Sequence, residues 1–165
     1  MAITRLNNNS ITSVTALPSG IPTGKVLQLT HGTLGTAVTR SGSGAFATGL
    51  ITSITPASTS NKIFISINIG GIRPQANTYL EFWLYRQING GGYSDLRKME
   101  NGFGYLQTSE PNTLSKSQFY LDTTHNTTSQ IDYQLYMGYQ GSGSQVAINN
   151  DQQEWSTITA MEIAN

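Results

Sequence analysis

The chain has 165 residues, no cysteine, and nine acidic against nine basic side chains. This length suits one domain, which buries roughly 70% of its unfolded surface and needs no disulfide or metal to hold a core. Without cysteine there are no disulfides, thiolate metal sites or thiol nucleophiles. The balanced charge argues against nucleic-acid binding, which usually relies on a basic excess or stripe.

Hydroxyl and amide groups supply most of the polarity of this chain. Ser, Thr, Asn and Gly make up 68 of the 165 residues, whereas charged residues make up only 11%. Proteins with a net charge near zero tend to associate, so the composition favours a protein that belongs to an assembly or works outside cells. An ordinary secreted β-domain is the alternative. No apolar run is long enough to predict a membrane span, and residues 1–14 lack the apolar core of a signal peptide.

Residues 1–24 differ in character from the rest of the chain. They are rich in Asn, Ser and Thr, contain two prolines, and carry their apolar residues singly. We predict an extended N-terminal arm at 1–24, followed by one domain at 25–165; a disordered tail is the alternative. The side chains expected to contact a neighbouring chain are Ile3, Leu6, Ile11, Val14 and Leu17.

The remaining residues show alternation of apolar and polar side chains with a period of two, and no sustained helical period. β-branched and aromatic residues dominate these segments, as is typical of strands, and Gly-, Pro- and Asn-rich turns separate them. Eight to ten short antiparallel strands predict an all-β sandwich or jelly roll. The segments are Val26–His31, Phe46–Thr55, Ile63–Ile69, Thr78–Gln87, Ser117–Leu121, Ile131–Met137, Gln145–Ile148 and Thr157–Ile163.

The segment Thr78–Gln87 has large side chains on both of its faces. Its leucines and phenylalanine must line the core, which leaves Tyr79, Trp83 and Tyr85 on the opposite face. A strand with water on one side normally carries smaller polar residues there, and an exposed aromatic stripe commonly marks an interface. We therefore predict a subunit interface at these three residues. A carbohydrate-stacking platform and coverage by a loop are the alternatives.

The sequence offers no constellation that predicts catalysis, a cofactor or a metal site. His31 ends an apolar segment and is expected in a turn or at a rim. Asp122 and His125 could share a metal, but two ligands without a third are weak evidence. No spacing among the nine carboxylates favours a glycosidase pair, and the P-loop, nucleophile-elbow and EF-hand patterns do not occur. We expect a protein that is not an enzyme.

Three segments resemble a small domain that recurs in virion proteins of tailed bacteriophages, especially phages of aquatic bacteria. They are Ile54–Ile65, Tyr120–Tyr133 and Ser156–Ile163, and the opening residues 3–21 resemble the amino ends of such proteins. The resemblance covers most of the chain, and its motifs are structural rather than catalytic. It implies a jelly roll similar to the trimeric C1q/TNF-like heads, in a capsid decoration protein, a head fibre or the tip of a tail fibre.

The chain lacks the long repetitive shaft that is usual in fibre proteins, which favours a compact module on the capsid. The resulting hypothesis is a non-enzymatic capsid decoration (cement) protein or head-fibre module that forms a homotrimer. Its arm would dock on other virion proteins, above all the major capsid protein, with no nucleic acid or membrane as partner. The alternative is a receptor- or glycan-binding tip of a tail fibre, whose partner would be a host glycan.

Overall fold

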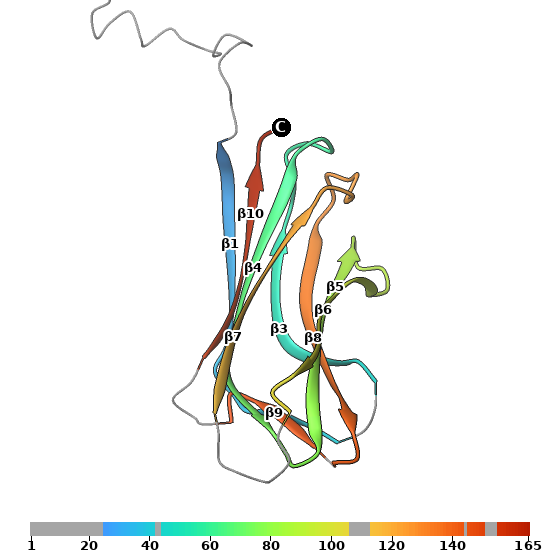
Figure 1. The fold of residues 1–165 in the computed structure, drawn as a ribbon. Helices are drawn as coiled ribbons and strands as arrows, with labels where there is room; N and C mark the ends of the chain where they lie inside the picture. Colours follow the sequence, from blue (N-terminus) through green and yellow to red (C-terminus); the bar gives the residue numbers. More distant parts are fainter. Residues whose placement is uncertain (1–24, 42–43, 106–112, 144, 151–154) are drawn as a thin grey trace, which may run out of the picture.

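The computed structural model describes residues 25–41, 44–105, 113–143, 145–150 and 155–165. The predicted arm at 1–24, with all of its predicted contact residues, lies outside them. The described residues form ten β-strands and no helix (Figure 1), and none of them forms a helix that could cross a membrane. The strands are β1 (Val26–Leu34), β2 (Val38–Arg40), β3 (Phe46–Ile54), β4 (Lys62–Pro74), β5 (Thr78–Ile88), β6 (Ser94–Phe103), β7 (Leu114–Asp122), β8 (Ile131–Gly141), β9 (Val146–Ile148) and β10 (Ser156–Ile163).

The strands form two sheets whose pairings are all antiparallel. One sheet runs β1-β10-β4-β9-β2, with β7 also paired to β4, and the other runs β3-β8-β5-β6. When the short β2 and β9 are left out, eight strands remain. One sheet then consists of β1, β10, β4 and β7, which are the first, eighth, third and sixth of these strands. The other consists of β3, β8, β5 and β6, which are the second, seventh, fourth and fifth. This is the strand order of a jelly roll, so the predicted all-β jelly-roll fold is confirmed.

The core lies between the two sheets and consists of every second residue of the long strands. In β4, the four isoleucines from Ile63 to Ile69 point inward and are at most 1% exposed. In β5, Leu80, Phe82 and Leu84 are fully buried, as the sequence predicted. Burying a side chain of this size stabilises a fold by about 1.5–3 kcal/mol. The inward faces therefore hold the two sheets together.

Two strands were not predicted from the sequence, and one residue lies in an element other than the one expected. β6 contains several charged residues and pairs with β5 through repeated register shifts, so it lacks a clean alternation. β2 is only three residues long. For His31 the sequence predicted a turn or a rim position. His31 lies inside β1 and not in a turn, because β1 stays paired with β10 as far as Leu34 opposite Ser156; it is exposed on this edge strand, which agrees with a rim position.

One edge of the sandwich is closed where β1 approaches β3 across the two sheets. The hydroxyls of Thr30 and Thr52 are 3.0 Å apart. At Gly32, an added Cβ would lie 1.8 Å from the carbonyl oxygen of Ile51. Only a residue without a side chain allows the two strands this close together.

The opposite edge is closed by charged and polar side chains between β6 and β7. The Lys116 ammonium lies 2.7 Å from a Glu100 carboxylate oxygen, and the Gln118 amide donates to the same oxygen at 3.2 Å. The hydrogen bond from Lys116, together with its charge, lowers the pKa of Glu100 below its ordinary value. This edge therefore depends on polar contacts, whereas the β1–β3 edge depends on close packing.

We expect Gly32→Ala to lower the free energy of unfolding by ~1–3 kcal/mol or more, because forcing extra volume into packed structure usually costs this much. The new methyl would collide with backbone, which cannot rotate away. Gly92→Ala is the matched control, because a Cβ at Gly92 would meet nothing within 4 Å. Urea denaturation of both variants measures the difference; equal stability would contradict the close β1–β3 approach.

Candidate functional site

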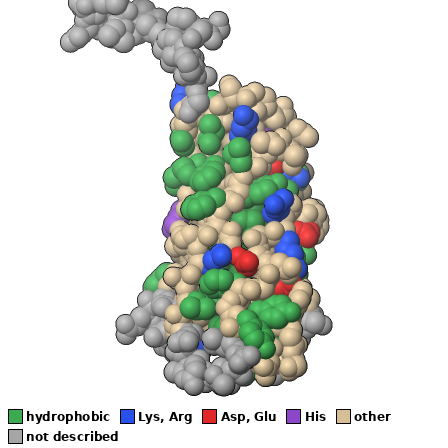
Figure 2. Space-filling view, viewed as in Figure 1, with side chains coloured by type: hydrophobic (Ala, Val, Ile, Leu, Met, Phe, Trp, Pro, Cys, Tyr) green, Lys and Arg blue, Asp and Glu red, His purple; other side chains and the backbone are tan. Residues whose placement is uncertain are grey.

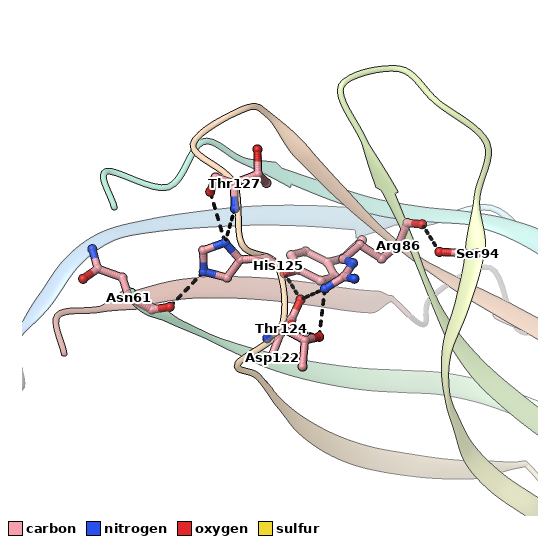
Figure 3. A network of polar contacts seen from close by, with 8 residues as sticks. Asn61, Arg86, Ser94, Asp122, Thr124, His125 and Thr127 are labelled. Atoms are coloured by element: carbon pink, nitrogen blue, oxygen red, sulfur yellow. Dashed lines mark hydrogen bonds and ion pairs between the residues drawn. The ribbon is translucent and has the colours of Figure 1, made fainter. Parts of the chain in front are cut away.

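A buried carboxylate at the end of β7 anchors a polar network (Figure 3). The side chain of Asp122 is 0% exposed, and one of its oxygens lies 2.7 Å from the Arg86 guanidinium. The Tyr133 hydroxyl donates to that same oxygen at 2.7 Å. The other oxygen accepts from the backbone N–H of Thr124 at 2.8 Å and from the Thr124 hydroxyl at 3.0 Å. Asp122 thus joins β7 to β5, β8 and the following loop.

The charge state of this network follows from its contacts. Burial by itself would raise the pKa of Asp122, but the hydrogen bonds from Tyr133, Thr124 and Arg86 and the charge of Arg86 outweigh it, so that pKa is lowered. Burial and the charge of Asp122 raise the pKa of Tyr133, which keeps this hydroxyl a donor. A carboxylate held charged by three partners is a poor general base. The network is suited to holding strands together.

His125 is also buried, at 3% exposure, and faces backbone groups. Its Nε2 lies 2.8 Å from the Asn61 carbonyl oxygen, and because a carbonyl only accepts, Nε2–H is the donor. Its Nδ1 lies within hydrogen-bond distance of the backbone of Thr127 (Figure 3). The nitrogens of His125 and the oxygens of Asp122 therefore face different partners. Among the described residues, no three His, Cys, Asp or Glu side chains gather as a metal site would require.

A second buried carboxylate, Glu162 of β10, fixes the loop between β3 and β4. It is 0% exposed and accepts from the Asn61 amide at 2.6 Å, the Ala57 backbone N–H at 2.7 Å and the Gln28 amide at 2.5 Å. Burial would raise the pKa of Glu162, but these hydrogen bonds lower it overall. Glu162 therefore stays charged at neutral pH and ties the loop to β1 and β10.

The predicted interface residues lie together on the outer face of the four-stranded sheet, which we call the aromatic face. Tyr79, Trp83 and Tyr85 are all partly buried. Tyr85 stacks on Tyr136 of β8 with ring centroids 3.9 Å apart, and the Lys98 ammonium lies 5.0 Å from the Trp83 ring. Tyr79 packs against a further tyrosine, with centroids 5.8 Å apart. The aromatic groups thus already have neighbours within their own chain, and their role as a subunit interface remains a prediction.

The outer face of the other sheet carries a row of apolar side chains that crosses four strands. Leu29 of β1 is opposite Met161 of β10, Met161 is opposite Phe64 of β4, and Phe64 is opposite Leu121 of β7. We call these four residues the apolar row. Its two ends are exposed to solvent: Leu29 by 57% and Leu121 by 44%.

More apolar side chains flank this row. Phe119 stacks against Phe64 with centroids 5.9 Å apart and is 62% exposed. Figure 2 shows a group of hydrophobic side chains in the upper part of this view, with further ones in its lower half. Toward the opposite end of the strands, the outer face becomes polar, with Thr157 opposite Asn68 and Asn68 opposite Ser117. We call the whole surface the apolar face; its members are Val26, Leu27, Leu29, Phe64, Phe119, Leu121, Met161 and Ile163.

Sequence reasoning placed the interface on the aromatic face and did not identify the apolar face. A partial signal was present in the sequence, because β1, β7 and β10 carry large apolar residues on the outer face near one end. Leu27 and Leu29 are two positions apart in β1, and Phe119 and Leu121 are two positions apart in β7. Met161 likewise lies on the outer face of β10. Each pair is short, so only cross-strand register shows that they form one surface.

The comparisons with known proteins place this chain in no family. No family model matches it, and no curated protein matches it. The solved structures similar to it include a mutant VP2 protein of infectious bursal disease virus in T=1 particles, at 12% identity and a TM-score of 0.48 over 83% of this chain and 36% of that one.

Two further solved structures show a weaker likeness. The infectious bursal disease virus Gt strain matches at 12% identity and a TM-score of 0.44, over 99% of this chain and 54% of that one. A chain described as CBM4 matches at 13% identity and a TM-score of 0.24, over 81% of this chain and 92% of that one. This chain thus spans about a third to a half of the length of the viral chains. At these scores the likeness carries no conclusion about function.

We expect the free energy of unfolding to fall as the pH drops from about 5 to 2. Asp122 and Glu162 have folded pKa values below their unfolded values, which are about 3.9 for Asp and 4.3 for Glu. Their stabilisation is complete above the unfolded pKa values and is lost as the pH falls through the folded ones. Urea denaturation at a series of pH values measures this.

Asp122→Ala serves as the matched variant for this acid dependence. It leaves Arg86 without its buried partner, so we expect a loss of ~3–5 kcal/mol at neutral pH and a shallower fall in acid. Asp95→Ala, at an exposed position of β6, should change stability by no more than about 0.5 kcal/mol. An unchanged acid profile in Asp122→Ala would contradict the depressed pKa.

Proposed function

We propose that this chain is a non-enzymatic structural protein of a virus particle, and in particular a capsid decoration protein of a tailed phage. The observation that carries the proposal is the apolar face, which crosses one sheet of a jelly roll whose chain has no net charge. Large contiguous apolar patches on otherwise polar proteins mark surfaces that other proteins cover. A protein that presents such a face is suited to an assembly.

The chemistry of the described residues also supports a structural role. The buried acids Asp122 and Glu162 are each held by several donors, and His125 faces backbone carbonyls. These groups stabilise strand ends and loops and show no arrangement of a nucleophile with a general base. They account for how a chain with few charged residues secures the edges of its sandwich.

Within this proposal the protein is a homotrimer that docks on the major capsid protein through residues 1–24. Closed rotational symmetry lets one surface patch satisfy every copy. Specific stable interfaces bury on the order of 1,200–2,000 Å² in total, which three domains and three arms can supply. The zero net charge supports close packing, since copies with a large net charge would repel one another.

A receptor- or glycan-binding tip of a tail fibre is the second candidate, and the aromatic face favours it. There Tyr85 stacks on Tyr136, and Tyr93 lies at a tilt to Tyr136 with centroids 6.0 Å apart. Aromatic rings at a surface can stack on sugar rings. However, Tyr85 and Tyr136 already present their flat faces to each other, so fewer faces remain for a sugar.

The copy number of the protein in virions tests the proposal. We expect hundreds of copies per particle, heads that burst more easily when the protein is absent, and a trimer by light scattering of the purified protein. Each result follows if the domain covers the shell together with its own copies. A handful of copies confined to the tail, with purified protein that blocks host adsorption, would support the receptor-binding candidate instead.

A deletion of residues 2–20 separates the contribution of the arm from that of the domain. The thermal unfolding midpoint of the deletion variant shows whether the domain still folds. A folded deletion variant should fail to join particles. If it decorates particles as well as the full chain does, the arm is not the anchor on the shell.

A further inference from the structure

We propose that the apolar face is the binding site for part of residues 1–24 of a neighbouring copy, so that subunits exchange their N-terminal arms while the remainder of each arm docks on the shell. This inference rests on the proposed function, because it requires an assembly in which copies lie side by side. It assigns to the arm a partner surface made of named residues, on the opposite side of the sandwich from the aromatic residues that the sequence indicated.

The geometry of the apolar face favours an extended occupant. The apolar row forms a continuous strip across β1, β10, β4 and β7, since each of its residues is the cross-strand partner of the next. Phe119 broadens the strip at the β7 side and is 62% exposed, while Val26 broadens it at the β1 side and is 55% exposed. A strip that crosses the strands suits a single extended segment laid over the sheet.

The place where the chain leaves the domain favours a neighbour's face over the chain's own. The Lys25 carbonyl oxygen accepts a hydrogen bond from the Ala164 N–H at 3.0 Å, and Val26 is paired with Ile163. The chain therefore still runs alongside β10 at Lys25, beyond Leu29 and toward the end of the sheet where the C-terminus lies (Figure 1). A segment that continues in this direction moves away from its own apolar row. It must reverse to cover that row, whereas the face of a copy that lies ahead of the exit point can be covered without a reversal.

The composition of residues 1–24 is suited to an apolar surface. Residues 1–24 contain Arg5 as their only charged side chain, so little charge would be removed from water when the segment lies on an apolar surface. Its single apolar residues recur every three to five positions from Ile3 to Ile21. This spacing can supply anchors along a strip while the Asn, Ser and Thr residues between them face water.

The length of the segment is sufficient for this exchange. A chain of 24 residues spans up to roughly 80 Å when extended, whereas four neighbouring strands span only about 15 Å across a sheet. Part of the segment can therefore bridge the space between two domains while the rest lies on the apolar face.

Disulfide cross-linking tests the proposal cleanly, because the natural chain has no cysteine. One full-length variant carries Val14→Cys, a second carries Phe119→Cys, and the two have tags of different mass. They are co-refolded, oxidised and separated without reducing agent. We expect a disulfide between the two different chains. Its yield should be several-fold higher than when Ser53→Cys replaces Phe119→Cys as the partner of Val14→Cys; Ser53 is a matched exposed position on β3 in the other sheet.

Phe119→Asp provides a second readout that needs no cross-link. Because Phe119 is 62% exposed, the variant should unfold within a few degrees of Ser53→Asp at concentrations where both are monomers, while its oligomer dissociates at a higher protein concentration than that of Ser53→Asp. A charge placed on the apolar face would have to be buried beneath the arm, whereas a charge at Ser53 would stay in water.

Three results would overturn the proposal. One is a yield with Phe119→Cys no higher than with Ser53→Cys. Another is a double variant, with Val14→Cys and Phe119→Cys in one chain, that links only within itself, which would show that each arm covers its own face. The third is Phe119→Cys linking only to its own counterpart in another copy, which would show face-to-face packing. If light scattering finds a trimer and one of these results holds, arm exchange is wrong and the proposed assembly stands; a monomer contradicts both.

Discussion

The packing of the two inward sheet faces against each other holds this structure together. Every second residue of the long strands enters the space between the sheets, and residues such as Ile65 and Phe82 are fully buried there. The opposite residues are then free to face solvent or another molecule. Because the core is complete without them, the outer faces can carry large apolar or aromatic groups without loss of the fold.

The few charged residues act mainly at the margins of this core. Asp122 and Glu162 are buried carboxylates that each bind several donors and tie strand ends to loops, and Glu100 links β6 to β7 through Lys116. Charges used inside the chain in this way add little to the surface field. A surface dominated by hydroxyls, amides and apolar groups remains, and such a surface is suited to close contact between copies.

The two outer faces differ in how far their side chains are already in contact within the chain. On the aromatic face, Tyr85 stacks on Tyr136 and Trp83 lies beside Lys98, so these groups gain contact energy in a single domain. On the apolar face, Leu29 and Phe119 remain more than half exposed. The free energy available from covering a surface scales with the apolar area removed from water, so the apolar face has more to gain from a partner.

The sequence alone predicts the all-β class and most of the strands, because burial of every second residue is a local pattern that segments such as Ile63–Ile69 show clearly. It did not determine β6, whose charged residues show no alternation and which forms because β5 offers it an edge to pair with. It also did not determine the apolar row. Leu29, Phe64, Leu121 and Met161 lie far apart in the chain, and only the cross-strand register of the folded sheet places them side by side.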